Sequence, residues 1–208
     1  MKKARIAVFV SGGGTNLQAL IDAEKSGILK SGEIVLVLSS SEGAYALERA
    51  KANGIATAVV SRKASASQAD FEENILFALE IAKADLIVLA GFMSILSADF
   101  TARFPKRILN VHPSLIPSFC GKGYYGLRVH EEALRYGVKV TGATVHFVNE
   151  IPDGGEIILQ KAVSIREGDT PEKLQKRVMR LAEWKILPAA TEQVCASIIA
   201  AKEGKIDV

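Results

Sequence analysis

Asn110 and His112 are the residues of this sequence whose types and spacing best suit chemistry at a carbonyl group. They flank Val111 at the end of a short apolar run. Because side chains alternate along a strand, both point the same way and can meet one substrate atom. An Asn amide can donate to a carbonyl oxygen, and a protonated His can stabilise or protonate the oxyanion formed by nucleophilic attack. The alternative is an Asn in a turn and a His packed at a strand end.

Asp153 is the third candidate, although Asp before Gly-Gly is also an ordinary turn signal. If this turn lies at the same end of the sheet as His112, the carboxylate can orient the imidazole, keep it protonated and accept a proton through water. Pro113 and Pro117 impose a rigid loop directly after His112. Such a loop at a strand end is typical of a ligand site in an α/β sheet.

The loop Ser11-Gly-Gly-Gly-Thr-Asn16 follows the first apolar run and precedes a segment with helical character. Backbone N–H groups and a helix N-terminus can hold an anion there, and phosphate is the natural candidate. Thr15 and Asn16 add side-chain donors. The loop matches neither G-x-G-x-x-G nor the Lys-containing nucleotide loop, which disfavours a dinucleotide or ATP. A plain strand-to-helix turn is the alternative.

Five short apolar runs alternate with helical segments and must position these residues. The alternation predicts an α/β fold with a parallel sheet. Because the runs are continuous, we expect strands that helices cover on both faces. The runs are Ile6–Val10, Ile34–Leu38, Ala56–Val60, Leu86–Ala90 and Ile108–Val111, and the expected helices cover about residues 16–26, 43–53, 68–83 and 95–103.

The pattern changes after residue 112. A Pro- and Gly-rich loop at 113–126 and a short helix near 127–135 come first. Two strand candidates follow, Lys139–Val148 and Glu156–Ser164, and the turn Pro152-Asp-Gly-Gly155 joins them. They predict a hairpin-like extension of the sheet.

The last helix is expected to begin with Thr170 as its N-cap and Pro171 at its first position. Leu174, Val178 and Leu181 are spaced as one face of that helix. No internal repeat or clear linker interrupts the 208 residues. We therefore expect a single domain over residues 1–208.

Composition and charge limit the classes of binding partner that we expect. The net charge of +3 is too small to argue for nucleic acid and is compatible with a small anionic ligand. The first apolar run is too short for a signal or a membrane span. Cys120 and Cys195 give neither a disulfide framework nor zinc spacing, which favours a reducing cytoplasm. We expect small-molecule substrates, no nucleic acid or membrane partner, and a monomer or homodimer.

The other histidines favour structural roles. His130 is expected in a surface helix, and His146 on a strand beside apolar neighbours. The three histidines show no metal-ligand spacing, so we expect no metal. Cys120 has no neighbouring pattern that activates a thiolate.

Several segments carry a family resemblance. They are Ser11-Gly-Gly-Gly-Thr-Asn-Leu17, Leu89-Ala-Gly-Phe-Met93, Asn110-Val-His-Pro-Ser-Leu115, Val145-His-Phe-Val148, Asp153-Gly-Gly155 and Ala182-Glu-Trp-Lys-Ile-Leu-Pro188. In this order, and over essentially the whole chain, they resemble the phosphoribosylglycinamide formyltransferases. The resemblance implies a Rossmann-like formyltransferase fold, a mostly parallel sheet flanked by helices with a C-terminal antiparallel extension. It also implies 10-formyltetrahydrofolate as formyl donor and glycinamide ribonucleotide as acceptor in de novo purine biosynthesis.

The resemblance also implies roles for residues of this chain. Asn110, His112 and Asp153 would be catalytic. Glu183 would contact the acceptor's ribose, and the glycine loop its phosphate; the implied ribonucleotide contacts are Gly13, Gly14, Thr15, Asn16, Leu17 and Glu183. The implied folate contacts are Gln68, Met93, Ser94, Ile95, Leu96, Asn110, Asn149, Glu150, Ile151, Pro152 and Asp153.

Three positions and one loop depart from the family pattern. Gln68 stands where members often carry a basic residue, available to the acidic tail of the folate. Ser94 stands where Arg is frequent, and Trp184 where His often follows the Glu. The loop Ser118–Gly126 is longer than in some relatives.

These observations lead to one hypothesis and its rivals. The acceptor amine attacks the formyl carbon, Asn110 and His112 stabilise the oxyanion, and Asp153 holds His112 and relays the proton through water. Two rivals share the Asn-x-His-Pro-Ser-Leu stretch: formyl transfer to an aminoacylated tRNA, and hydrolysis of formyl-folate. Both are expected to need additional domains. A third rival is a catalytically silent sensor of a phosphate ligand, against which the intact Asn110, His112 and Asp153 count.

Overall fold

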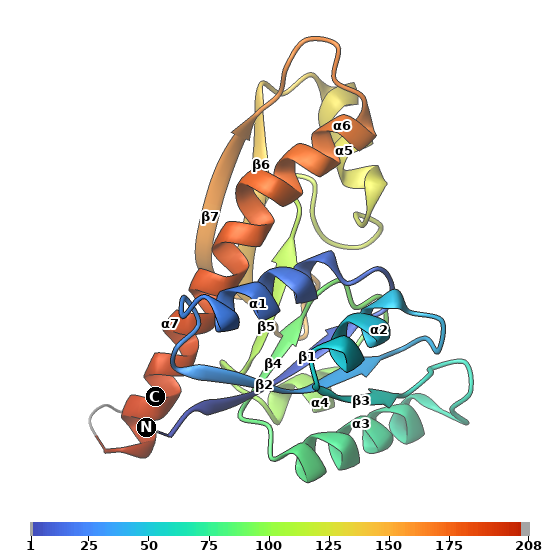
Figure 1. The fold of residues 1–208 in the computed structure, drawn as a ribbon. Coiled ribbons are helices and arrows are strands. Elements are labelled where there is room, and N and C mark those ends of the chain that lie inside the picture. The colour runs from blue at the N-terminus through green and yellow to red at the C-terminus, as the bar shows by residue number, and fades with distance from the viewer. Residues whose placement is uncertain (1, 205–208) are drawn as a thin grey trace.

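One seven-stranded sheet organises the chain, and a computed structural model describes it over residues 2–204. The strand order is β3-β2-β1-β4-β5-β6-β7 (Figure 1). Pairs among the first five strands are parallel, whereas β6 pairs antiparallel with β5 and β7. The expected α/β fold with an antiparallel extension is confirmed. The strands are β1 Ala4–Val10, β2 Gly32–Ser39, β3 Ala56–Val59, β4 Leu86–Leu89, β5 Ile108–His112, β6 Val140–Phe147 and β7 Ile157–Ser164.

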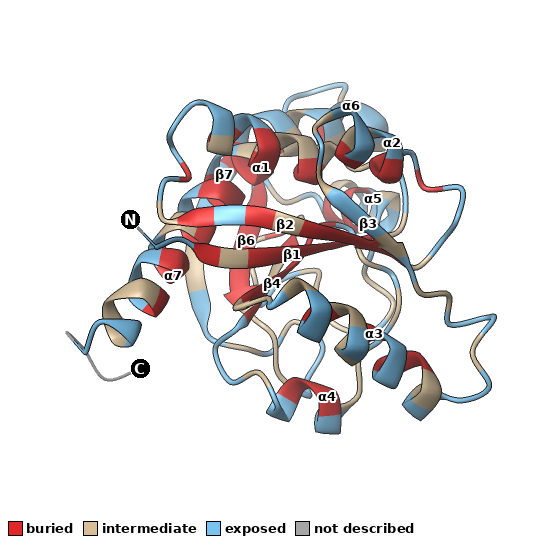
Figure 2. Cartoon of the chain, turned by 60° about the horizontal axis from the view of Figure 1, so that its bottom comes forward, coloured by how far each residue is buried: buried red, intermediate tan, exposed pale blue. Residues whose placement is uncertain are grey.

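Helices cover both faces of the parallel part, with α1 and α2 on one face and α3 and α4 on the other (Figure 2). Alternate residues of β1 pack in two hydrophobic cores, one on each face of the sheet. Val8 packs in the cluster that contains Leu17 and Leu187, and Phe9 packs in the cluster that contains Phe71. The helical elements are α1 Thr15–Lys25, α2 Tyr45–Ala52, α3 Gln68–Ala82, α4 Ala98–Ala102, α5 Leu127–Tyr136, α6 Pro171–Val178, the π-helical turn η1 Met179–Glu183 and α7 Trp184–Lys202.

The order of the strands creates a switch point beside β1. The chain runs from β1 to β2 and β3 on one side, then returns to β4 on the other. Ligands of open α/β sheets bind at the carboxyl ends of the strands at such a point. The glycine loop follows β1 there, and the Met93 backbone N–H, after β4, donates to the Ser11 hydroxyl at 2.8 Å. The two loops are thereby joined.

Two details differ from expectation. β3 is an edge strand, paired only with β2, and most of its residues are exposed, so helices do not cover it on both faces. Leu181 is 38% exposed, although Leu174 and Val178 are buried as expected. The π-helical turn adds a residue to the helical path, and one residue of an α-helix turns about 100°. It therefore buries Ala182 and Glu183 in place of Leu181.

The helix start at Thr170 is confirmed. The Thr170 hydroxyl accepts from the backbone N–H of Lys173, and Pro171 occupies the first position. Over residues 2–204, no helix combines the length and apolar character that a membrane crossing needs.

Candidate active site

The side chains of Asn110, His112 and Asp153 lie together. Nδ1 of His112 is 3.4 Å from Oδ2 of Asp153. Nδ2 of Asn110 donates to Oδ1 of the same carboxylate at 3.4 Å. Asn110 and His112 point the same way from the end of β5, and Asp153 comes from the connection between β6 and β7. The expected proximity of Asp153 to His112 is confirmed.

His112 has a defined arrangement of ring protons. Its Nε2 lies 2.9 Å from the carbonyl oxygen of Phe119, which can only accept. Nε2 therefore carries a hydrogen, and in the neutral ring Nδ1 turns its lone pair toward Asp153. Burial lowers the pKa of His112 and outweighs the charge of Asp153 and the Phe119 hydrogen bond, which raise it. The charge of Asp153 therefore favours the protonated ring, as expected, but less strongly than burial opposes it.

Asp153 stays ionised despite its partial burial. Burial raises the pKa of this carboxyl, but the hydrogen bond with His146, the charge of His112 and the backbone N–H of Gly121 together hold it below its usual value. Gly121 N donates to Oδ2 at 2.8 Å. The carboxylate therefore ties the 118–126 loop to the β6–β7 connection.

Local backbone geometry aims Asp153 at the site. Its φ of 57° lies in the left-handed region, which costs a non-glycine residue about 1–3 kcal/mol. At Gly155 a Cβ atom would lie 1.8 Å from the carbonyl oxygen of Phe147, so only glycine allows the chain to pass there. Gly155 therefore has a steric role in addition to its place in the turn.

The 118–126 loop closes over His112. Phe119, whose carbonyl binds His112, has a φ of 50° and so holds a second strained backbone position. The segment just before this loop is fixed by Thr144 on β6, whose hydroxyl donates to the Ser114 carbonyl at 2.7 Å and accepts from Ile116 N. The Phe119 carbonyl therefore occupies Nε2 of His112 in this structure.

Sequence reasoning undervalued two histidines. His146 faces Asn110 across β5 and β6, with its Nε2 3.2 Å from Nδ2 of Asn110. This pairing was detectable only from the strand register. His130 was expected on the surface, but it is fully buried, and both its ring nitrogens lack a hydrogen-bond partner among residues 2–204. Burial and the charge of nearby His112 lower the pKa of His130 to about 4.

The glycine loop is built to expose its amides. Gly14 has a φ of 70°, and a Cβ atom there would lie 2.6 Å from Cβ of Ala46, so α2 packs directly against the loop. Nε of Arg49 donates to the Gly13 carbonyl at 2.9 Å. Because Arg49 binds the Gly13 carbonyl, the loop keeps its shape, and the backbone N–H groups at the start of α1 can bind an anion.

The side chain of Asn16 makes a different contact from the one expected. Its Nδ2 donates to Oε2 of Glu183 at 2.8 Å, and both side chains are buried. The side-chain donor expected for the phosphate therefore faces Glu183, although Oδ1 of Asn16 has no partner among the described residues. Burial raises the pKa of Glu183 to about 7 against the lowering effect of this hydrogen bond. Leu17 is buried in the core behind the loop.

A basic cavity of about 780 Å³ lies next to Thr15. Arg180, from the π-helical turn, lines it together with Trp184. Of the other cations, Arg177 is paired with Asp169. Lys173, Lys176 and Arg166 complete the basic lining. Sequence reasoning missed this cavity because the π-helical turn that presents Arg180 gives no pattern in the sequence.

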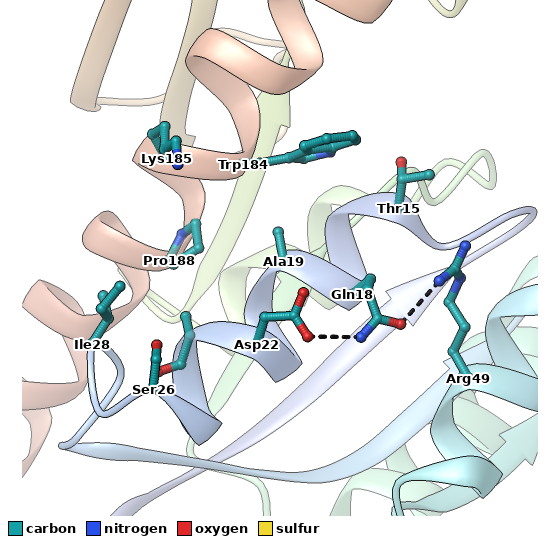
Figure 3. A pocket seen from close by; sticks show the side chains of 11 residues that line it. Thr15, Gln18, Ala19, Asp22, Ser26, Ile28, Arg49, Trp184, Lys185 and Pro188 are labelled. Atoms are coloured by element: carbon teal, nitrogen blue, oxygen red, sulfur yellow. Dashed lines mark hydrogen bonds between the residues drawn. The ribbon is translucent and has the colours of Figure 1, made fainter.

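A second groove shares Thr15 and Trp184 with that cavity and runs between α1 and α7 (Figure 3). Gln18 occupies its floor, where it donates to Asp22 and accepts from Arg49. The carboxylate of Asp22 makes this groove less suited to a phosphate than the basic cavity. Gln18 instead helps to hold Arg49, which supports the glycine loop.

The residues that are expected to contact the folate lie on the other side of the switch point. Met93 and Ile95 are 57% and 81% exposed, an apolar surface suited to an aromatic ligand. Ser94 and Leu96, which alternate with them along the chain, are partly buried. Gln68 belongs to α3 and donates to the Ile95 carbonyl at 3.1 Å.

The 149–152 segment precedes Asp153 and is mostly exposed. The Asn149 side chain accepts from Ile151 N at 3.0 Å, which rigidifies the turn. Ile151 is 58% exposed, and Glu150 and Pro152 are exposed as well. Within residues 2–204, no group of three or more His, Cys, Asp and Glu side chains could hold a metal ion.

Comparisons with known proteins agree with this geometry. Residues 4–191 match the model of the family described as formyl transferase. The human trifunctional purine biosynthetic protein adenosine-3 is 45% identical over 99% of this chain, which spans 20% of that protein's length. The phosphoribosylglycinamide formyltransferase of Haemophilus influenzae is 45% identical over 90% of this chain and 84% of its own length.

Solved structures give the same result. The crystal structure of phosphoribosylglycinamide formyltransferase from Brucella melitensis is 45% identical, with a TM-score of 0.86 over 94% of this chain and 97% of that one. The chain therefore belongs to the formyl transferase family and, within it, to the phosphoribosylglycinamide formyltransferases.

Proposed function

We propose that the chain transfers the formyl group of 10-formyltetrahydrofolate to the amine of glycinamide ribonucleotide, giving formylglycinamide ribonucleotide and tetrahydrofolate. The observation that carries this proposal is the convergence of Asn110, His112 and Asp153 at the end of β5, on the sheet edge that also carries the glycine loop after β1 and the exposed apolar residues after β4. We further propose that residues 1–208 act as one domain, because a single sheet contributes both substrate surfaces.

In the proposed reaction, the acceptor nitrogen attacks the formyl carbon and a tetrahedral oxyanion forms. Nδ2 of Asn110 and Nε2–H of His112 donate to that oxyanion, the latter after substrate has displaced the Phe119 carbonyl. When Nδ1 of His112 is protonated, it faces the carboxylate of Asp153. The carboxylate then stabilises the imidazolium. The amine loses one proton, the C–N bond to the folate breaks, and the folate nitrogen gains one proton.

The acceptor is proposed to bind on the side of the glycine loop, away from the residues proposed for the folate. The amides after Gly13 and the guanidinium of Arg180 suit a monoester phosphate. Glu183 is the proposed ribose ligand, since its second oxygen can accept from a hydroxyl when Oε2 is held by Asn16. The folate would pack its rings on Met93 and Ile95.

A direct assay tests the proposal. The purified chain is mixed with 10-formyltetrahydrofolate, and loss of the donor is followed spectroscopically with and without glycinamide ribonucleotide. Loss that depends on the ribonucleotide supports the proposal. Loss without any acceptor indicates a formyl-folate hydrolase, loss only with aminoacylated tRNA indicates a tRNA formyltransferase, and no loss at all indicates a silent phosphate sensor.

A further inference from the structure

The proposed folate wall has no charge of its own. Residues 93–97 read Met-Ser-Ile-Leu-Ser. The donor of the proposed reaction ends in a glutamate tail, whose carboxylates are ionised at neutral pH. Any cation that binds this tail must therefore come from a neighbouring segment, so the contacts of the wall identify where to look.

One hydrogen-bond chain connects the wall to a cation. Nε2 of Gln68 donates to the Ile95 carbonyl at 3.1 Å, and its Oε1 accepts from Nε of Arg62 at 2.9 Å. Gln68 thus holds a guanidinium at the edge of the wall. Among residues 2–204, the two terminal nitrogens of Arg62 have no hydrogen-bond or ion-pair partner, and the side chain is exposed. A guanidinium presented in this way can bind a carboxylate through both of those nitrogens.

The surroundings of Gln68 keep this arrangement in place. Glu72 accepts from Nε2 of Gln68 at 2.6 Å and from the backbone and hydroxyl of Ser97, also at 2.6 Å. The loop that carries Arg62 is ordered as well, because the Ser61 carbonyl accepts from both the backbone and the hydroxyl of Ser65. The guanidinium is therefore presented by a fixed support, which limits the entropy lost on binding.

Charge separates the two sides of Gln68. The groove between α3 and α4 is lined by Glu72, Glu73 and Asp99, with Arg103 as its cation. Burial raises the pKa of Glu72, but hydrogen bonds from Ser97 and Gln68, with a smaller contribution from the charge of Arg103, hold it below its usual value. An anionic tail is repelled from this groove and attracted to the side that Arg62 occupies.

We propose that Arg62, held by Gln68, binds the glutamate tail of the folate donor and sets the preference of this chain for donors with an acidic tail. This inference rests on the proposed function. It assigns a specificity role to a residue that the sequence pattern did not single out. It also gives Gln68 a function, as the support of the cation.

The test compares Arg62→Ala with wild type on two donors, 10-formyltetrahydrofolate and 10-formyltetrahydropteroate, which lacks the glutamate. We expect the KM for the folate to rise about 3- to 10-fold in R62A while kcat at saturating donor changes less than twofold, as for an exposed ion pair. The KM for the pteroate should be the same in both proteins. Lys63→Ala, which removes the adjacent exposed cation, should change neither KM.

Binding separates failure of this inference from failure of the proposed function. Calorimetric titration with tetrahydrofolate and tetrahydropteroate needs no turnover, so it decides the role of Arg62 even if no formyl group is transferred. Weaker binding of tetrahydrofolate alone in R62A supports the inference. Unchanged tetrahydrofolate binding, an equal loss for both ligands, or an equal effect of K63A overturns it.

Discussion

The imidazole of His112 and the carboxylate of Asp153 face each other through Nδ1 and Oδ2 at 3.4 Å, while the opposite ring nitrogen of His112 contacts the Phe119 carbonyl. The charge of Asp153 raises the pKa of His112 against the larger lowering effect of burial. Removing that charge must lower the pKa of His112 further, and with it the fraction of imidazolium at neutral pH.

We expect Asp153→Asn to reduce kcat about 10- to 100-fold at neutral pH. Because the pKa of His112 falls in this variant, the ratio of mutant to wild-type activity should rise as the pH is lowered. The pH dependence of kcat between pH 5 and 8 checks this. A constant ratio across that range would mean that Asp153 does not act through the proton of His112.

Asn110→Ala should reduce kcat about 100-fold, because one oxyanion donor is typically worth ~3 kcal/mol. The KM for the ribonucleotide should stay within about threefold, since Asn110 lies at the end of β5 and the proposed phosphate site begins after β1. Steady-state kinetics with each substrate varied in turn provide the measurement. A rise in the acceptor KM with normal kcat would remove Asn110 from the oxyanion site.

Gly14→Ala should impair the glycine loop, because the added methyl would meet Ala46 of α2 at 2.6 Å on a backbone with φ of 70°. We expect a loss of about 1–3 kcal/mol in unfolding free energy and a rise of at least about tenfold in the acceptor KM. Gly12→Ala is the matched control, since a Cβ there meets nothing within 4 Å. Equal effects of the two substitutions would contradict the assigned role of the Gly14 backbone.

Glu183→Gln tests the buried carboxyl. The folded pKa of about 7 lies above the ordinary value of 4.5, so the folded state binds more protons between these values. The stability of wild type should therefore fall relative to E183Q as the pH rises from about 4.5 to 7, by roughly 3 kcal/mol at most. Urea denaturation at pH 4.5, 6 and 8 measures the difference. A gap that does not change with pH would indicate an ordinary carboxyl.

Most of the sheet could be predicted from sequence because local patterns determine it. Continuous apolar runs predicted the buried strands β1 and β4, and the Thr170-Pro171 pair predicted the start of α6. Burial of β3 was mispredicted, because an edge position depends on strand order and not on local composition. The exposure of Leu181 depends on a π-helical turn, which likewise has no local signal.

The site was predictable in part, for the same physical reason. The two-residue period placed Asn110 and His112 on one face, but the approach of Asp153 depends on where the β6–β7 connection lies in the folded chain. The pairing of His146 with Asn110 follows from the antiparallel register. The hydrogen bond between Asn16 and Glu183 joins residues that are 167 positions apart. The periodicity of the sequence does not reveal such a contact.

The most direct test of the account measures formyl transfer by wild type and His112→Ala side by side. Wild type should form one formylated ribonucleotide for each tetrahydrofolate released, only when the ribonucleotide is present. H112A should retain its fold and acceptor affinity while kcat falls about 100-fold or more, since it loses the Nε2–H donor. Turnover by H112A within a few-fold of wild type would contradict the central claim that His112 acts on the reacting formyl group.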